Sequence, residues 1–266
     1  MSGVRAGSAP RLRALWIALF WIAVGVASYI LGVRSALGQQ AEASVLDAAE
    51  FTTDPPAPLN LVSIPTIAIA LAAIGVIAAL AHGFARAARV VLVAGAAIAT
   101  SQLLKGLVLS RPTLFELDDV NTFPSGHMTV FTALVAALAL AVPDRLRAIV
   151  ALAGTALLSV VGWQLLAYGW HRPSDVFGAL ALGVALFAAV SALWPLRGSG
   201  RPALGGGIGI GLALCGWIVV AAATALAATA GITANADLML SAGEFGAVGA
   251  SALAARSVLR LGGVRN

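Results

Sequence analysis

Charged residues are scarce in this 266-residue chain and make up only 10% of it. Hydrophobic residues make up 60%, whereas soluble domains average roughly 45–50% apolar and 25% charged residues. So few charges cannot cover the surface of a soluble domain of this length, which excludes that class of protein. Lysine is almost missing, since Lys105 is the single lysine among sixteen basic residues. This preference for arginine indicates a GC-rich, bacterial coding genome and carries no chemical information.

Cysteine is almost missing too. Cys215 is the single cysteine, so an intrachain disulfide bond is excluded. It lies inside an apolar run. The formal net charge of +5 raises the question of nucleic-acid binding. The arginines are not gathered on any soluble segment, however, so we expect membrane lipids and not nucleic acid as partners.

Long apolar runs are the dominant feature of the sequence. A helix needs about 20 apolar residues to cross a hydrocarbon core roughly 30 Å thick. Eight runs approach this length, and the fourth is the shortest. They cover 12–33, 61–81, 90–110, 127–142, 148–168, 176–194, 204–228 and 243–261.

The charges predict how these spans are oriented. With the N-terminus in the cytoplasm, twelve of the sixteen basic residues fall on the cytoplasmic side, as the positive-inside rule requires. Ten of the eleven acidic residues, all but Asp144, fall on the other side. We therefore expect both termini in the cytoplasm. Only four basic residues fall on the outer side, and cations that lie there indicate a function. They are Arg34, Lys105, Arg111 and Arg172.

Two segments flank the central spans. Residues 34–60 are polar and contain a proline-rich stretch, so we expect an outside loop that is ordered at most in part. The first span is interpreted as an uncleaved anchor, with a signal peptide that ends near Ala36 as the alternative. The last two spans carry no motif. The expected organisation is a membrane core over 1–194 and an accessory transmembrane hairpin over 195–266.

The third motif in chain order, His171-Arg172-Pro173-Ser174-Asp175, lies at the start of the sixth span. Residues four apart on a helix share a face. A carboxylate bonded to one imidazole nitrogen fixes the tautomer and leaves the other nitrogen able to attack phosphorus. An interfacial pair that only anchors the helix is the alternative.

A second motif, Pro124-Ser125-Gly126-His127, opens the fourth span. The first N–H groups of a helix have no intrahelical partner, so this start is suited to an anion, and Gly126 permits a close approach. His127 is placed to protonate a leaving alkoxide as a general acid. An ordinary turn and cap is the alternative, although it leaves a second histidine on the same membrane face unexplained.

The first motif in chain order runs from Lys105 to Arg111-Pro112, at the end of the third span. Fixed cations stabilise the charge that spreads over the oxygens of a phosphoryl group in transfer. Pro112 disfavours a helical conformation for Arg111, so we expect the helix to end and the guanidinium to turn toward the loop. Snorkelling of Lys105 to the interface is the alternative.

These three motifs, in this order and with these separations, resemble those of the type 2 phosphatidic acid phosphatase superfamily. They cover residues 105–175, and the resemblance implies an all-α, polytopic membrane bundle with a six-helix core. It implies that His171 is a nucleophile that forms a phosphohistidine, that Asp175 orients it, and that His127 protonates the leaving group. It also implies that no metal or other cofactor is needed, and that the phosphate oxygens are bound by Lys105, Arg111, Ser125 and Gly126.

The sequence departs from the family pattern at two places. Five residues separate Lys105 from Arg111, where the family has six. The third motif of the family begins with Ser-Arg, and Gln164 and Leu165 occupy those positions here. One phosphate-binding arginine is therefore missing, and our hypothesis is that Arg172 replaces it.

The resemblance predicts hydrolysis of a lipid phosphomonoester or diphosphate at the extracytoplasmic face of a bacterial plasma membrane. Polyprenyl diphosphate, phosphatidylglycerol phosphate and phosphatidate are the candidate substrates. A lipid phosphotransferase and a catalytically silent lipid-binding or transport protein are the alternatives. Three acids near the phosphate site are interpreted as a solvated loop, with a divalent cation that bridges a diphosphate as the alternative; they are Glu116, Asp118 and Asp119.

Overall fold

The computed structural model describes residues 8–114, 120–195 and 205–262. Within these ranges the chain forms α-helices joined by turns and short helical segments, and no strand. This confirms the all-α fold class. The helices are α1 (Ser8–Ser28), α2 (Ala36–Asp47), α3 (Ile64–His82), α4 (Phe84–Leu103), α5 (Gly126–Ala141), α6 (Arg147–Ala167), α7 (Pro173–Leu193), α8 (Gly205–Thr233) and α9 (Ala236–Leu261).

Short helical segments extend or connect these helices. Two are π-helical turns, η1 (Tyr29–Val33) after α1 and η3 (Leu104–Val108) after α4. Two are 3₁₀ turns, η2 (Leu59–Leu61) and η4 (Asp144–Leu146). A π-helical turn inside an α-helix frequently lies at a functional site, and η3 contains Lys105.

Seven of the described helical segments are long and apolar enough to cross a membrane, which indicates an integral membrane protein. They correspond to seven of the eight predicted spans. The remaining span, α5, has only 16 residues, or about 24 Å at 1.5 Å per residue. Most of its side chains are buried, because α3, α4, α6 and α7 all pack around it. The short helix is therefore the centre of the bundle rather than a lipid-facing span.

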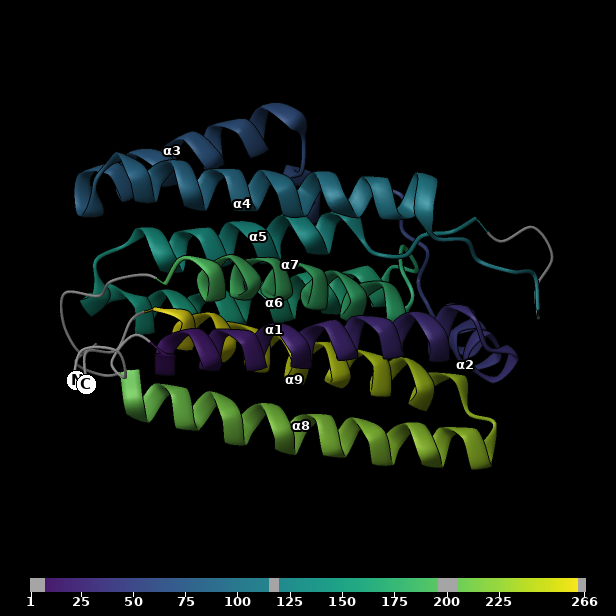
Figure 1. Cartoon of the computed structure of the whole chain (residues 1–266). Coiled ribbons are helices and arrows are strands. Elements are labelled where there is room, and N and C mark those ends of the chain that lie inside the picture. The colour runs from purple at the N-terminus through teal and green to yellow at the C-terminus, as the bar shows by residue number, and fades with distance from the viewer. Residues whose placement is uncertain (1–7, 115–119, 196–204, 263–266) are drawn as a thin grey trace.

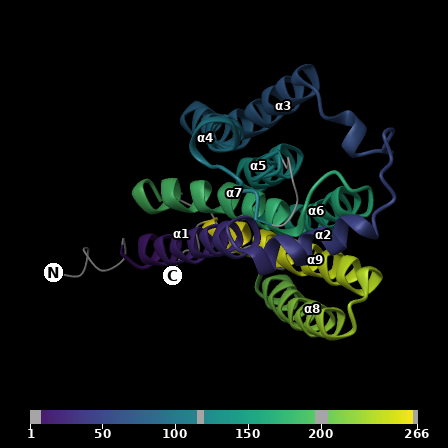
Figure 2. The ribbon, with the colours of Figure 1, turned by 90° about the vertical axis from the view of Figure 1, so that its right-hand side faces the viewer.

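The eight described helices other than α2 run back and forth along one axis (Figure 1). Helices α1, α4, α6 and α8 end at the end of the bundle where α2 lies, and α3, α5, α7 and α9 begin there. Seen along the axis, α3 and α4 lie on one side of α5, and α8 and α9 lie beyond α7 and α6 (Figure 2). All three motifs therefore lie at the α2 end, opposite the start of α1 and the end of α9.

Local sequence explains where several helices begin. The Ser63 hydroxyl accepts a hydrogen bond from the Thr66 N–H, and the Asn235 side chain accepts one from the Leu238 N–H at 2.9 Å. Such side chains satisfy N–H groups that have no intrahelical partner. Pro173 is the first residue of α7, where its missing N–H costs nothing.

The segment 34–60 differs from the expected partly ordered loop. It contains the 12-residue helix α2, capped by Ser35, with Gln39, Glu42 and Val45 buried. The Gln39 amide donates hydrogen bonds to the carbonyl oxygens of Val33 and Pro112. The expectation missed this helix because two of its polar residues, Gln39 and Glu42, are buried and hydrogen-bond to segments at the motif end of the bundle.

The last two helices pack unequally on the rest of the bundle. Helix α9 packs along α6 and α7, whereas α8 packs chiefly on α9. Glycines permit the close approach of α9: a Cβ at Gly243 would lie 3.2 Å from Pro173 Cγ, and one at Gly246 would lie 2.9 Å from Phe177 Cζ. The hairpin predicted for 195–266 thus contacts the first turns of α7, next to the third motif.

Candidate active site

His171 and Asp175 form the pair that the third motif predicts. His171 Nδ1 lies 3.1 Å from Asp175 Oδ2. His171 is 8% exposed and Asp175 is fully buried. With Nδ1 directed at the carboxylate, Nε2 is the ring atom that can react, because the partner of one nitrogen decides the role of the other.

The Asp175 carboxylate is held by two further donors. The Thr122 hydroxyl donates a hydrogen bond to Oδ2 at 2.6 Å, and the Arg172 N–H donates to the same oxygen at 3.1 Å. Arg172 Nη1 in turn donates to the Thr122 hydroxyl oxygen at 3.3 Å. Hydrogen bonds to a carboxylate favour its charged form and fix its position. Thr122, which the sequence did not single out, thus connects Arg172 to the histidine–aspartate pair.

The turn between α6 and α7 fixes the place of His171. The N–H groups of Trp170 and His171 both donate to the Leu165 carbonyl oxygen, at 3.1 and 3.0 Å. Gly169 has φ +69°, a backbone conformation that side chains other than glycine rarely adopt. The Trp170 indole donates to the Thr52 carbonyl oxygen at 2.8 Å, which ties this turn to the loop after α2.

The second motif forms the N-terminus of α5, as predicted. The Ser125 hydroxyl accepts a hydrogen bond from the Met128 N–H at 3.3 Å, and the Ser125 N–H donates to the Asp175 carbonyl oxygen at 3.0 Å. Ser125 therefore joins α5 to α7, and its own N–H is already occupied by a protein partner. Gly126 and His127, which follow it, are partly exposed.

His127 lies close to the other predicted catalytic groups. Its ring contacts the Trp170 ring edge-on, with centroids 5.6 Å apart. Trp170 is the neighbour of His171 in the chain. Both His171 and Lys105 lie close enough to His127 to interact with it electrostatically. The structure therefore brings the two histidines, from separate helices, to one end of the bundle and to one locality.

Lys105 reaches this locality from the end of α4. A Cβ built on Gly126 would lie 4.0 Å from Lys105 Nζ, so the ammonium group is close to the start of α5. Lys105 lies in the π-helical turn η3. The Asn121 side-chain amide donates hydrogen bonds to the carbonyl oxygens of Lys105 and Leu109, which stabilises the end of this turn. A π-helical turn is wider than an α-helical turn, so it changes the direction in which Lys105 points. This change can compensate for the one residue fewer that separates Lys105 from Arg111 than in the family.

Arg111 lies after the end of the helix, as Pro112 predicts, and it is paired with a carboxylate. Its Nη2 donates to Glu42 Oε2 at 3.1 Å, and the Arg111 side chain is only 2% exposed. Glu42 Oε1 accepts a hydrogen bond from the Ser174 N–H at 3.0 Å. One carboxylate on α2 therefore connects Arg111 to the first turn of α7.

The electrostatics of Glu42 differ from those of an exposed glutamate. Burial and the nearby negative charge of Asp175 raise its pKa above the ordinary value, while the hydrogen bonds from Ser174 and the charge of Arg111 act in the opposite direction. Sequence reasoning missed Glu42, because it was grouped with the acids of a polar loop. Only a helical reading of 36–47, with Glu42 on its buried face, would have found it.

The two positions where the family has Ser-Arg are occupied by uncharged side chains with other contacts. The Gln164 amide donates to the Ala57 carbonyl oxygen at 3.0 Å, and Leu165 is fully buried in α6. Arg172, which we expect to replace that arginine, is 6% exposed and directs Nη1 toward Thr122, beside Asp175. Its place is next to the reactive pair, although its role stays a prediction.

Other candidate ligands fall outside this locality or outside the described ranges. Glu116, Asp118 and Asp119 lie in the segment 115–119, which is not among the described residues. Within the ranges that the structure describes, no three His, Cys, Asp or Glu residues are grouped closely enough to hold a metal ion. The described polar groups of the site are therefore two imidazoles, two carboxylates, and several cations and hydroxyl groups.

Comparison with known proteins agrees with the motifs. No curated protein and no solved structure matches the chain significantly. Residues 86–199 match the family model described as the PAP2 superfamily. The match covers α4 to α7 and contains all three motifs. Over this segment, which is less than half of the chain, the sequence is similar to the PAP2 superfamily, a phosphatase-type family, as its motifs predicted.

Proposed function

We propose that this protein is an integral membrane phosphatase that hydrolyses a lipid phosphomonoester or diphosphate through a phosphohistidine at His171. The single observation that carries the proposal is the buried pair of His171 and Asp175 beside a second imidazole, His127. An anchoring pair does not need a second histidine near it, whereas a phosphoryl transfer with an alkoxide leaving group needs both a nucleophile and an acid.

In the first step, His171 Nε2 attacks phosphorus while the phosphorus–oxygen bond to the lipid breaks. The leaving oxygen takes a proton from His127, and the phosphoryl group stays on His171. Asp175 holds the ring in position and stabilises the positive charge that develops on it, in the manner of the carboxylate of a serine–histidine–aspartate triad. The hydrogen bond from Thr122 and that from the Arg172 N–H keep Asp175 in place.

In the second step, water attacks the phosphoryl group and the nitrogen–phosphorus bond breaks. His127, now neutral, removes the proton from the water molecule, so inorganic phosphate leaves and both histidines return to their starting states. The same group acts as acid in one step and as base in the next.

The nearby cations support the phosphoryl oxygens in both steps. Lys105 lies by the N-terminus of α5, and Arg172 lies by Asp175. We expect Arg111 to bind a phosphate oxygen in exchange for part of its contact with Glu42, since a phosphate and a carboxylate compete for the same guanidinium geometry. Fixed positive charges aimed at developing negative charge supply the largest part of catalysis in such reactions.

The surroundings of the site support a lipid substrate. The reacting groups lie at one end of a bundle of apolar helices, so a lipid headgroup can reach them while its tails stay in the bilayer. The charge distribution of the sequence favours the extracytoplasmic face. Polyprenyl diphosphate, phosphatidylglycerol phosphate and phosphatidate are all consistent with these features.

The test is release of inorganic phosphate from each of these three lipids by the purified full-length protein in detergent, with EDTA present. We expect release from at least one lipid by the wild type and none above background by His171→Ala. Turnover by His171→Ala at the wild-type rate would contradict the proposal. A phosphoester formed with an added labelled alcohol would identify a phosphotransferase, and binding of all three lipids without release would identify a silent binding protein.

A further inference from the structure

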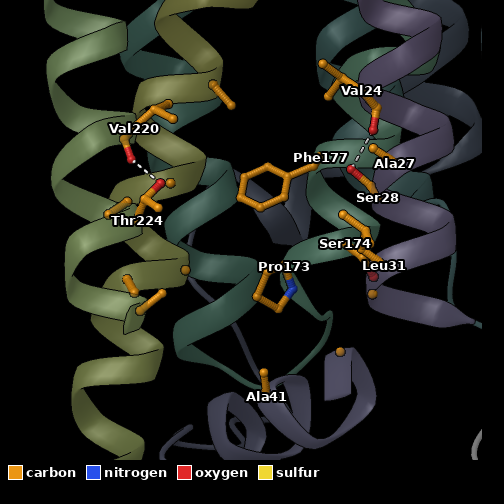
Figure 3. Close-up of a pocket in the computed structure, with 18 of the residues that line it drawn as sticks. Val24, Ala27, Ser28, Leu31, Ala41, Pro173, Ser174, Phe177, Val220 and Thr224 are labelled. Atoms are coloured by element: carbon orange, nitrogen blue, oxygen red, sulfur yellow. Dashed lines mark hydrogen bonds between the residues drawn. The ribbon is translucent and has the colours of Figure 1, made fainter. Parts of the chain in front are cut away.

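A groove runs between α1 and the α8–α9 hairpin, and it meets the candidate site only at its motif end, where Glu42 and Ser174 line it. Its larger chamber, of about 630 Å³, is bounded by α1, α7, α8 and α9 and closed by α2 at the motif end. Figure 3 shows Val24 and Ala27 of α1 and Leu31 of η1 on one side of it. Val220 and Thr224 of α8 lie on the other side, with Phe177 of α7 between the two sides. The lining is almost entirely apolar, so this chamber suits a hydrocarbon chain.

The groove continues toward the opposite end of the bundle. A second chamber of about 510 Å³ shares Phe20, Trp217 and Leu253 with the first. The Phe20 and Trp217 rings meet edge-on there, with centroids 6.3 Å apart. The two chambers are therefore neighbouring parts of one groove, joined at an aromatic pair.

The second chamber ends among three arginines. Arg13 comes from the start of α1, and Arg256 and Arg260 come from the last turns of α9. Arg260 is close enough to repel both Arg13 and Arg256. The Arg256 Nε donates to the Gly209 carbonyl oxygen at 3.2 Å, which holds this arginine against α8.

These like charges have no counter-charge within the part of the chain that the structure describes. No carboxylate there forms an ion pair with any of the three arginines. The Arg13 Nε is buried and has no hydrogen-bond partner among the described residues. Like charges that are held together beside a partly desolvated space repel one another unless an anion lies between them. The arrangement therefore favours an anionic ligand at this end.

We propose that the groove binds one anionic phospholipid, with its headgroup phosphate among Arg13, Arg256 and Arg260 and an acyl chain in the apolar chambers. The arginine end lies at the end of the bundle opposite His171, in the leaflet where the sequence places most of its basic residues. Basic pockets between transmembrane helices on that side suit acidic lipid headgroups. This site gives the α8–α9 hairpin a role that does not depend on catalysis.

The lipid is identified by two properties that can be separated. The three arginines require a negative headgroup, and the apolar chambers require a chain. A zwitterionic lipid fulfils the second requirement only, and a soluble anionic headgroup fulfils the first only. A phosphodiester lipid such as phosphatidylglycerol tests the site without serving as a phosphomonoester substrate.

The experiment is native mass spectrometry of the delipidated full-length protein, titrated with phosphatidylglycerol, phosphatidylcholine or glycerophosphoglycerol. We expect retention of one phosphatidylglycerol, with affinity at least about tenfold above that of the other two ligands, since charge-assisted hydrogen bonds and chain burial each contribute this much. Equal binding of phosphatidylcholine would contradict the headgroup assignment. Equal binding of glycerophosphoglycerol would contradict the chain assignment.

Matched variants locate the binding. Arg13→Gln combined with Arg260→Gln is expected to weaken phosphatidylglycerol about tenfold or more. Arg145→Gln, an exposed arginine outside the groove, is expected to have no effect. Ala227→Phe fills the apolar chamber and is expected to weaken binding, whereas Ala222→Phe adds the same ring to an exposed position of α8 outside the lining. Equal affinities within either pair would overturn the proposal, and Arg13→Lys, which keeps the charge, provides a folded positive control.

Discussion

Glu42 and Arg111, which lie 69 positions apart in the chain, form a buried ion pair at 3.1 Å beside the predicted nucleophile. The second oxygen of the same carboxylate accepts a hydrogen bond from the Ser174 N–H, one residue before Asp175. A helix in the segment between the first two spans therefore contacts both Arg111, the predicted phosphate-binding cation, and α7, the helix that carries Asp175. We infer that Glu42 is a positioning residue, because each of its carboxylate oxygens accepts a hydrogen bond from a group next to the predicted site.

The raised pKa of Glu42 predicts a pH dependence of stability. A pKa that is higher in the folded than in the unfolded state means that the folded protein holds the proton more tightly. The contribution of this group then favours folding fully below the ordinary glutamate pKa and is lost as the pH rises through the folded pKa. In Glu42→Gln this contribution is absent, so the stability of the variant relative to wild type should increase between acidic and neutral pH.

Thermal unfolding in detergent, measured across this pH range, checks the prediction. Glu50→Gln, an exposed glutamate in the loop after α2, is the matched control and should keep the wild-type profile. A difference between Glu42→Gln and wild type that does not change with pH would show that Glu42 has an ordinary pKa.

Thr122→Val should lower kcat roughly tenfold or more and leave KM nearly unchanged. The variant loses the 2.6 Å hydrogen bond to Asp175, and a hydrogen bond to a charged group contributes roughly 1.5–3 kcal/mol. Steady-state phosphate release measures this split. Thr155→Val removes a hydroxyl that bonds only to the Ala151 carbonyl oxygen within α6, and it should retain full activity. A rise in KM alone would show that Thr122 acts on substrate binding rather than on the pair.

His127→Ala should discriminate between leaving groups. A general acid contributes on the order of 10²–10⁴-fold when the leaving group is a poor one. Loss of His127 should therefore abolish release from a lipid phosphate, whose alkoxide needs a proton, and should affect formation of the phosphoenzyme from an aryl phosphate much less. Equal losses on both substrates, measured in single-turnover experiments, would assign His127 to binding instead of proton transfer.

Arg172→Ala should lower phosphate release on the order of 10²–10³-fold, the range found when one aimed donor is removed from a transition state. The reason is its position beside Thr122 and Asp175, where it would replace the arginine that Leu165 does not provide. Arg145→Ala, at an exposed site in η4 between α5 and α6, serves as the control. Near-normal turnover in Arg172→Ala would rule the replacement out.

The hydrophobicity of the sequence was enough to predict most of the fold. Apolar runs are a strong signal because a helix must cross the whole hydrocarbon core, and all eight predicted runs are helices in the structure. The prediction for the fourth span was weaker. That span is α5, which is short and buried on most sides, and a hydropathy pattern cannot distinguish such a helix from a lipid-facing span. The family match over residues 86–199 confirms the resemblance that the motifs indicated.

The sequence predicted those residues of the candidate site whose contacts are local and follow from a fixed spacing. It missed the residues whose contacts are long-range. His171 and Asp175 share a helix turn, so their contact follows from their spacing. The contact of Thr122 with Asp175 spans 53 positions and that of Glu42 with Ser174 spans 132 positions, and no local pattern indicates either. Helix α2 was missed because it is short and contains polar residues such as Gln39, Gln40 and Glu42, which indicate a loop unless their partners are known.

The most direct test of the account is the search for a phosphoryl group on the protein itself. Wild-type protein mixed rapidly with phosphorus-radiolabelled phosphatidate or another accepted lipid, then quenched in alkali, should carry acid-labile label on the peptide that contains His171. His171→Asn should carry none. Label on a different residue, or rapid wild-type turnover with no labelled protein on the timescale of the first turnover, would contradict the proposed phosphohistidine.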